Sequence, residues 1–470
     1  MIRNHTGDVE GGMGGSEAFE GFPKALFKER RRRVLEELGS GAMVLPAAPI
    51  LHRTGDSELR YRADSELFYL TGFTEPEAVL VLRGFADEDR SVLFVRPRDD
   101  KAERWTGSRV GPERVPSLYG VDSARMFAQL GDCLPALLAG ADRVFFRIGR
   151  DGAAERGVVQ ALEAARTKGQ REGTGPRTVV DPGEILDELR LRKDAKEIAA
   201  MRAAASVTAA AVREGIDRVG PGIGEWEVEA EVEAGFRRRG ASGPAFPTIV
   251  GSGPNACTLH YVLNSRRMEA GDLVLIDAGA ERRMYSGDIS RTVPVSGRFS
   301  SEQADVYRVV EEARTRAVAA VAPGVPFEKV HRAALGALVE GLIELGVLAG
   351  DSQSLIEKKA QEPYFPHRTS HWLGLDTHDV GSYAKDGVSR SLEPGMVLTV
   401  EPGLYFPGLT PGSKPGSKKG SPFAGIGIRI EDDVLVTEGG REVLTAELPT
   451  GPDEISALVG AIRTPKGRKR

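Results

Sequence analysis

Short apolar runs alternate with helical spacing in the first part of the chain. Residues 24–39 place apolar side chains three and four positions apart among charged ones, and similar patterns recur at 125–139 and 152–167. Between them, apolar runs bounded by Gly, Asp and Pro predict strands: A-M-V-L-P (42–46), E-A-V-L-V-L (77–82), R-S-V-L-F-V (90–95) and R-V-F-F-R-I (143–148). This alternation predicts a small α/β domain over residues 21–180, with the polar loop 168–176 close to its boundary.

The pattern changes from about residue 184. Stretches rich in Ala, Leu, Glu and Lys predict long helices over 184–212, and helical spacing returns at 224–239, 301–321 and 327–347. The remaining apolar segments are short, β-branched and bounded by Gly or Pro, which is typical of strands. Because helices come in pairs and strands in hairpin-like groups, we expect an α+β domain with an antiparallel curved sheet over residues 181–455.

Composition limits the classes of protein that fit. The chain has 470 residues, of which 40% are hydrophobic, so two domains are expected. A net charge of -5 gives no reason to expect a nucleic-acid partner. No apolar run reaches about 18 residues, so no membrane span is expected. Two cysteines, Cys133 and Cys257, fit free thiols in a reducing cytoplasm.

Three segments look unstructured. Residues 1–20 are Gly-rich and acidic, without the apolar centre of a secretory signal, and we expect them to be disordered. Residues 456–470 end in a basic tail that we expect to be solvated. The G-S-K-P-G-S-K-K-G-S run (412–421) predicts a mobile loop, and its spacing does not match a phosphate-binding loop.

Five side chains of the second domain conflict with their surroundings. Four carboxylates and one imidazole occur within short apolar runs that predict strands or strand ends: Asp277, Asp288, His371, Glu401 and Glu431. Carboxylates are rare in such runs unless a positive group is bound beside them. Each residue alone could be a turn, cap or packing residue, which is the commoner role of a single Asp or His. Five together favour a metal site.

Asp277 and Asp288 flank a turn. If the turn centres between Arg282 and Arg283, the two acids are cross-strand neighbours on one face of a hairpin, with Cβ atoms about 4.5–5.5 Å apart. Like charges at that separation are destabilising unless a cation bridges them. This register is an assumption about the turn.

The charge of the set suggests which ions bind. Four carboxylates carry about four negative charges, which two divalent cations match. An oxygen-rich set with one imidazole favours Mn²⁺, with Co²⁺ and Zn²⁺ as alternatives. Two such ions can generate a hydroxide from water and polarise a carbonyl group. Three further histidines lie near these runs and could assist the chemistry: His260, His367 and His378. His331 has no such neighbours along the chain and is interpreted as a surface or structural residue.

Several blocks of the chain form a recognisable set, at residues 251–261, 277–295, 365–381, 392–405 and 425–433. In order and spacing they resemble aminopeptidase P, the Xaa-Pro aminopeptidases of the pita-bread metallopeptidase family M24B. In the first half, F-Y-L-T-G-F-T-E-P-E-A-V-L-V-L (68–82) and E-R-W-T-G-S-R-V-G (103–111) resemble the amino-terminal domain of that family. The resemblance covers roughly residues 25–450 and implies a pita-bread (creatinase/aminopeptidase-like) catalytic domain after the smaller α/β domain.

The resemblance also implies an activity and a role for each residue. It implies release of an N-terminal residue that precedes proline, through a hydroxide bridging two Mn²⁺ ions. Asp277 would hold one ion, Asp288 and Glu431 would bridge both, and His371 and Glu401 would complete the second. The other implied roles are proton handling by Glu401, substrate contacts by His260 and His378, the proline side by His367, and ligand orientation by Arg429 and Tyr405. Trp105 matches a residue that lines a neighbouring subunit's pocket in tetrameric relatives, so a homo-oligomer (dimer or tetramer) is expected.

Two departures and three rival families bear on this resemblance. The run K-D-G-V-S-R (385–390) lacks an Arg that relatives often carry soon after Asp, and the insertion 412–421 has no matching segment in the family. Prolidase, which cleaves Xaa-Pro dipeptides with the same cage, is the close alternative, although S-H-W-L-G-L-D (370–376) resembles the aminopeptidase more. A metal-free pita-bread protein would have lost ligands that this chain retains. Methionine aminopeptidase lacks such an amino-terminal domain.

Overall fold

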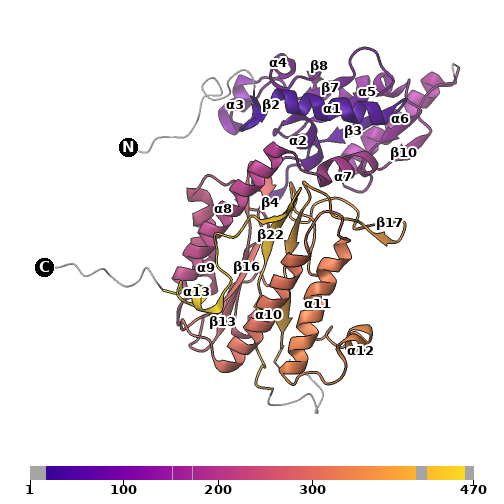
Figure 1. The fold of residues 1–470 in the computed structure, drawn as a ribbon. Coiled ribbons are helices and arrows are strands. Elements are labelled where there is room, and N and C mark those ends of the chain that lie inside the picture. The colour runs from indigo at the N-terminus through magenta and orange to yellow at the C-terminus, as the bar shows by residue number, and fades with distance from the viewer. Residues whose placement is uncertain (1–16, 151, 172, 409–420, 461–470) are drawn as a thin grey trace. The chain divides into compact units, whose positions relative to one another are not determined.

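The computed structural model describes residues 17–150, 152–171, 173–408 and 421–460. Two compact units divide the chain, Met1–Arg190 and Leu191–Arg470 (Figure 1). The predicted boundary after residue 180 lies ten residues before this division. Within the described segments, no helix combines the length and the apolar character needed to cross a membrane.

The first unit is an α/β domain built on a mixed six-stranded sheet with the order β10-β9-β3-β6-β7-β8. Val and Phe side chains of its central strands pack with Leu side chains of the helices in one core, which explains the apolar runs of the sequence. The strands are β3 (Ala42–Pro46), β6 (Val79–Arg83), β7 (Ser91–Val95), β8 (Ser123–Met126), β9 (Arg143–Phe145) and β10 (Thr178–Val180). The helices are α1 (Lys24–Leu38), α2 (Ser65–Thr71), α3 (Asp100–Thr106), α4 (Val115–Tyr119), α5 (Leu130–Leu138), α6 (Gly152–Gly169) and α7 (Gly183–Leu191).

Two parts of this unit differ from the sequence prediction. The helix predicted over 125–139 is preceded by β8, and a short 3₁₀ turn η1 (Phe127–Gln129) leads into α5. Within the stretch 1–20 that was expected to be disordered, Glu17–Phe19 form strand β1, which pairs with β2 (Phe22–Pro23), and Phe19 packs edge-on against Phe68. Residues 1–16 lie outside the described part. A small hairpin joins β4 (His52–Thr54) to β5 (Ser57–Glu58).

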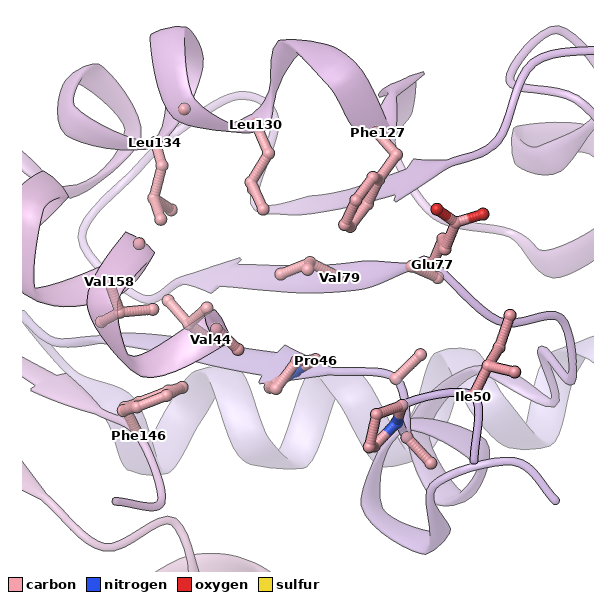
Figure 2. A pocket seen from close by; sticks show the side chains of 17 residues that line it. Val44, Pro46, Ile50, Glu77, Val79, Phe127, Leu130, Leu134, Phe146 and Val158 are labelled. Carbon is pink, nitrogen blue, oxygen red and sulfur yellow. The ribbon is translucent and has the colours of Figure 1, made fainter. Parts of the chain in front are cut away.

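An apolar cavity of about 300 Å³ lies in the first unit between the sheet and its helices. Figure 2 shows Val44, Pro46 and Val79 on the strands facing Leu130 and Leu134 from the helix above. Among the described residues that line this cavity, Glu77 is the one ionisable side chain. The cavity therefore lacks the clustered titratable groups that acid–base or metal chemistry requires.

The second unit pairs long helices against antiparallel strands. Helices α8 and α9 contact each other, as do α10 and α11, and Figure 1 shows both pairs beside strands β13, β16 and β22. Asp194 caps α8 through the backbone N–H groups of Lys196 and Glu197, and Ser300 caps α10. The helices are α8 (Ala195–Arg218), α9 (Glu225–Arg238), α10 (Ser301–Ala320), α11 (Phe327–Glu344), α12 (Ser352–Glu357) and α13 (Pro452–Ser456).

Every strand pairing in the described part of this unit is antiparallel, which confirms the α+β prediction. A 3₁₀ turn, η2 (Gly253–Cys257), follows β12. The strands are β11 (Gly243–Pro244), β12 (Ile249–Ser252), β13 (Leu273–Ala278), β14 (Ala280–Arg282), β15 (Tyr285–Ser286), β16 (Ile289–Pro294), β17 (Ala384–Lys385), β18 (Val388–Ser389), β19 (Val397–Val400), β20 (Gly403–Tyr405), β21 (Gly427–Arg429), β22 (Asp432–Thr437) and β23 (Gly440–Val443). The predicted loop 412–421 lies outside the described residues except for Ser421, and so does the tail beyond residue 460.

The hairpin register assumed from the sequence is wrong. Arg282 pairs with Tyr285, and the intervening Arg283 and Met284 both have positive φ angles, 54° and 71°, as a two-residue hairpin turn of the primed type requires. The turn is centred one residue later than assumed, so each pairing shifts by two residues. Asp277 therefore faces Ser290 directly. Since a shift of two preserves the face, Asp288 remains a diagonal neighbour of Asp277 on the same side of the sheet.

Candidate metal centre

A cavity of about 670 Å³ in the second unit is lined by side chains that were predicted from the sequence to form the metal site. All five predicted metal ligands line it: Asp277, Asp288, His371, Glu401 and Glu431. His260, His367, His378 and Arg429 line it as well. The segments that carry these side chains span more than 170 positions of sequence, so the fold brings them together from strand ends and irregular segments that are distant along the chain.

Strand ends supply the four carboxylates. Asp277 is the penultimate residue of β13, Asp288 directly precedes β16, and Glu401 directly follows β19. Glu431 lies between β21 and β22. In each case the apolar neighbours are buried in the sheet core, which positions the acid at the edge of the cavity.

His371 differs from its predicted setting in a strand. The residue lies in an irregular segment, and the next residue, Trp372, forms an isolated bridge to Leu398. The backbone N–H of His371 donates to Thr399 Oγ1 at 3.1 Å, and Thr399 N–H donates to the His371 carbonyl at 3.0 Å. These bonds and the buried indole of Trp372 hold His371 in place without a strand.

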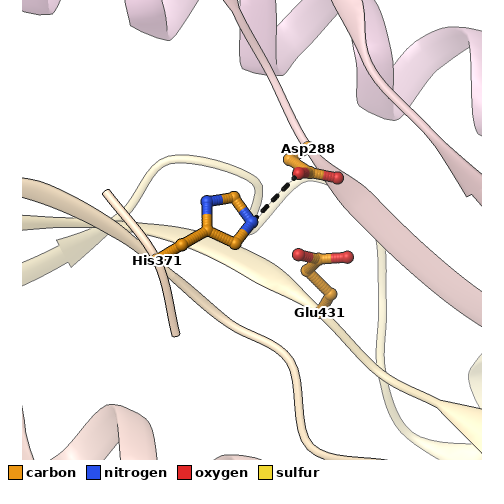
Figure 3. Close-up of side chains that lie close together, drawn as sticks. All are labelled: Asp288, His371 and Glu431. Atoms are coloured by element: carbon orange, nitrogen blue, oxygen red, sulfur yellow. Dashed lines mark ion pairs between the residues drawn. The ribbon is translucent and has the colours of Figure 1, made fainter. Parts of the chain in front are cut away.

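Three of the side chains form the tightest group. Ligand atoms of Asp288, His371 and Glu431 all lie within 4.8 Å of one another, and Figure 3 shows the imidazole facing both carboxylates. His371 Nε2 is 3.6 Å from Asp288 Oδ2 and also 3.6 Å from Glu401 Oε1. Asp277 joins the group through Arg429, whose Nη2 contacts Asp277 Oδ2.

The tautomer of His371 suits metal binding. Its Nδ1 lies 3.0 Å from the Trp372 carbonyl oxygen, which can only accept, so Nδ1 carries the proton. The lone pair of Nε2 is then directed at Asp288 and Glu401. Burial lowers the pKa of His371 to about 4, so the imidazole is neutral at physiological pH. A neutral imidazole with its second nitrogen bonded to a carbonyl is the usual form of a metal-bound histidine.

The carboxylates are difficult to ionise together. Burial and the neighbouring Glu431 raise the pKa of Asp288 well above its ordinary value. Burial and Glu401 do the same to the pKa of Glu431. Burial raises the pKa of Glu401 to about 8, although Arg429 acts in the opposite direction. A bound cation would reverse these shifts because it stabilises the charged forms.

The residues fit a divalent metal. Asp277 Oδ1 is buried and has no hydrogen-bond partner among the described atoms, although the other oxygen of this carboxylate contacts Arg429. Four carboxylates face one buried cation, Arg429, which would leave three negative charges uncompensated when all are ionised. Carboxylate oxygens with one imidazole are donors that suit Mn²⁺ and similar ions.

A hydrogen-bond network that starts at Arg429 holds the neighbouring side chains of the centre in place. Arg429 Nε donates to Ser290 Oγ at 2.9 Å, and Ser290 Oγ donates to Glu431 Oε2 at 2.7 Å. Arg429 Nη1 donates to the Tyr405 hydroxyl at 2.9 Å. That hydroxyl lies 3.0 Å from His367 Nε2, and because His367 Nδ1 donates to the Arg368 carbonyl, Tyr405 is the donor to Nε2.

The remaining predicted residues lie at different places. The ring of His378 packs edge-on against His371, with centroids 4.5 Å apart, and His260 lines the cavity wall. Trp105 lies on α3 of the first unit with 86% of its surface exposed.

The sequence interpretation missed three residues that lie at or beside the centre. Ser290 supports Glu431, and the correct hairpin register would have revealed it because it faces Asp277. Asp433 Oδ2 accepts from the backbone N–H of Asp288 at 3.1 Å. His331, interpreted as surface or structural, is half-buried and lies 2.8 Å from Thr369 Oγ1, next to the residues that carry the centre. Nothing in the local sequence of His331 signals that position.

Comparisons with known proteins agree with this geometry. The model of "Metallopeptidase family M24" matches residues 199–438, and that of "Aminopeptidase P, N-terminal domain" matches residues 27–145. The Xaa-Pro aminopeptidase of Escherichia coli strain K12 is 44% identical over 440 residues, which cover 93% of this chain and 98% of that protein.

Solved structures give the same result. The aminopeptidase PepP of Pseudomonas aeruginosa superposes with a TM-score of 0.89 at 41% identity, covering 94% of this chain and 99% of that one. A zinc-substituted E. coli aminopeptidase P in complex with product superposes with a TM-score of 0.88 at 43% identity and the same coverage. The similarity therefore extends over both units.

Proposed function

The chain belongs to metallopeptidase family M24 and carries an aminopeptidase P N-terminal domain, and from this membership we propose that it is an Xaa-Pro aminopeptidase. It releases the N-terminal residue from peptides whose second residue is proline. The observation that carries this proposal is the buried group of Asp288, His371 and Glu431, which lies in a cavity with two further acids and three histidines.

We assign the metal ligands as follows. Asp277, Asp288, His371, Glu401 and Glu431 would together hold two divalent cations, with Asp288, His371 and Glu431 the most closely grouped of the five. Mn²⁺ is the proposed ion because the donors are mainly carboxylate oxygens, and zinc is named for a relative. When bound, the ions make water nucleophilic near neutral pH and polarise the substrate carbonyl.

The chain's own side chains supply the remaining functions. Glu401, whose Oε1 lies 3.6 Å from His371 Nε2, would receive the proton of the attacking water. His260 and His378 line the cavity and donate to the negative oxygen that develops on the scissile carbonyl. His367, held by Tyr405, lines the side that receives proline. Arg429 and Tyr405 orient the carboxylates.

Two further assignments rest on sequence and similarity. We propose that the protein works in the cytoplasm, because both cysteines are free thiols. We also propose a homo-oligomer (dimer or tetramer) in which Trp105 lines a neighbouring subunit's site, since this indole is exposed on α3.

The proposed activity is tested with two matched substrates, Ala-Pro-Ala and Ala-Pro. Protein freed of metal by a chelator should cleave neither peptide. Added Mn²⁺ should restore cleavage of the tripeptide with release of alanine. A strong preference for the dipeptide would identify a prolidase instead. Full activity after thorough chelation, with no metal detected by elemental analysis, would contradict the proposed metal chemistry.

A further inference from the structure

A second cavity, of about 850 Å³, adjoins the candidate metal centre. The two cavities share four lining residues, Arg368, Ser370, His371 and His378, so a ligand bound at the centre can extend from one into the other. The volume lies in the range of pockets that enclose ligands the size of a short peptide. A substrate longer than two residues therefore has room beyond the reacting bond.

The lining of this second cavity is positively charged. Lys329 and Arg332 reach it from the first turns of α11, and Arg368 from the segment that precedes His371. Glu328 is the one carboxylate among its described lining residues. Three cations against one anion leave an excess of two positive charges, which attracts an anionic ligand and repels an ammonium group.

Arg368 is available to a ligand. Its guanidinium lies 3.3 Å from Glu328 Oε1, but 70% of the Arg368 side chain and 35% of the Glu328 side chain are exposed. An ion pair exposed to that degree is worth little, so a ligand carboxylate can compete for the arginine. The backbone of Arg368 is held in place because its carbonyl accepts from His367 Nδ1 at 2.7 Å.

The wall of the second cavity is tied to the metal centre. His331 Nδ1 lies 2.8 Å from Thr369 Oγ1, and the His331 ring stacks on Phe365. The carbonyl of Thr369 accepts from the backbone N–H of Glu401 at 2.8 Å. The segments that carry the positively charged side chains of the second cavity are therefore connected to the metal centre by direct hydrogen bonds and ring contacts.

We infer that Lys329, Arg332 and Arg368 form a binding subsite for the terminal carboxylate of short peptides whose scissile bond lies at the metal centre. The inference rests on the proposed Xaa-Pro activity. Charge sets the direction of the peptide, because the substrate's α-ammonium would be repelled by this wall whereas its carboxylate is attracted. The carboxylate of an Xaa-Pro dipeptide lies on the proline itself, so the subsite favours tripeptides and tetrapeptides.

The test compares Ala-Pro-Ala-Ala with its C-terminal amide on the Mn²⁺-loaded protein. The acid should have a kcat/KM about 5-fold higher or more at low salt, mainly through a lower KM, and the difference should shrink as salt is added. The double variant Lys329→Gln/Arg332→Gln and the single variant Arg368→Gln should each reduce the acid-to-amide ratio. The control Lys358→Gln removes an exposed lysine that does not line the cavity and should keep the wild-type ratio.

A binding measurement separates this inference from the proposed activity. Calorimetry should show that Pro-Ala-Ala binds more tightly than its amide to the wild type and that both variants lose this difference. Equal kcat/KM and equal binding of acid and amide, or a ratio that the variants leave unchanged, would overturn the subsite. If the wild type cleaves no Xaa-Pro peptide, the proposed function fails, and calorimetry still decides the subsite.

Discussion

At the scale of single residues, the centre depends on acids in places where ionised carboxylates are costly. Asp277, Asp288 and Glu431 expose 8%, 4% and 2% of their surfaces, yet Arg429 is the one buried cation that lines their cavity among the described residues. Burial and the neighbouring carboxylates accordingly raise the pKa values of Asp288 and Glu431. Bound cations would reverse these shifts, so stability and metal binding should be linked.

Replacing Asp288 by Asn should separate these two effects. The variant should lose metal-dependent peptidase activity by about 100-fold or more, because it removes a proposed metal ligand, and changes even to the partners of such ligands cost about 10–100-fold. With the metal removed by chelator, the Tm of the variant at pH 8 should rise by about 2 °C or more, because Asn neither carries a buried charge nor has to bind a proton on folding. Thermal unfolding with and without Mn²⁺ checks this, with Asp305→Asn at an exposed position of α10 as the control. A lower Tm of the variant than of the wild type in the presence of chelator would contradict a destabilising effect of Asp288 in the metal-free protein.

Stability without metal should fall as pH rises from about 6.5 to about 8. Unfolded Glu401 loses its proton near pH 4.5, whereas the folded residue, with a pKa of about 8, keeps it, so folding binds an extra proton in this window. Each such proton changes the free energy of unfolding by about 1.4 kcal/mol per pH unit. His367 and His371 have lowered pKa values, about 3 and about 4, and reverse the trend only below about pH 6.5, where their unfolded forms become charged.

Urea unfolding in chelator at several pH values measures this slope. Mn²⁺ should invert it, because metal binding displaces the retained protons and tightens as pH rises. A stability that is flat or increases from pH 6.5 to 8 in chelator would show that the acids are ionised without a cation.

At the scale of elements, a tight hairpin positions two of the acids. The strand pairs β13–β16 and β14–β15 share one register, and between them Gly279 passes close to Gly287, the residue before Asp288. A Cβ atom at Gly279 would lie 1.9 Å from the Gly287 carbonyl oxygen and 2.7 Å from the Phe246 ring. No side chain fits there without moving the backbone that carries Asp288.

The variant Gly279→Ala should therefore disrupt the centre. We expect a loss of stability of about 1–3 kcal/mol from overpacking, and a Mn²⁺ affinity lowered by about tenfold or more because Asp288 is displaced. Denaturant unfolding and metal titration measure the two effects. Gly439→Ala is the matched control, since a Cβ there meets nothing within 4 Å. Equal behaviour of the two variants would show that the close approach is unimportant.

At the scale of the molecule, a buried ion pair connects distant parts of the second unit. Lys193 Nζ lies 3.0 Å from Asp379 Oδ2, both side chains are 1% exposed, and 186 positions separate them. The backbone N–H of Asp379 donates to the Trp372 carbonyl, which also accepts from His371 Nδ1. The pair thus fixes the segment that carries both His371 and His378.

Removing one partner of this pair should be costly. Lys193→Met leaves the Asp379 carboxylate buried without its ammonium partner, and we expect a loss of about 3–5 kcal/mol in the free energy of unfolding. The neighbouring Arg192–Glu393 pair is about half exposed, so Arg192→Gln should cost less than about 1 kcal/mol. Urea unfolding of both variants tests the contrast. Similar losses in the two variants would show that the buried ion pair contributes no more to the free energy of unfolding than the exposed one.

Much of the fold and of the centre could be predicted from residue order. The strands Ala42–Pro46 and Ser91–Val95 and the helix Lys24–Leu38 appear where spacing predicts them, because burial of an apolar face is a local signal. The five candidate ligands were named from a conflict between chemistry and setting, and the three histidines from their closeness in sequence to those ligands. The structure places all eight around one cavity.

Other features could not be predicted from residue order and were found only in the folded chain. The hairpin register depends on which two residues accept positive φ angles, and neither Arg283 nor Met284 signals a turn. The neighbours of His331, Asp433 and Lys193 come from segments distant in sequence, brought together by packing of helices and strands. Side-chain chemistry and local periodicity can be read from residue order alone. They predicted the elements and a metal site, and the resemblance of the motifs to a known family gave the reaction class. Distances between remote segments follow from the packing of the whole unit, so only the tertiary structure decided the pairing of the acids and the cationic cavity beside them.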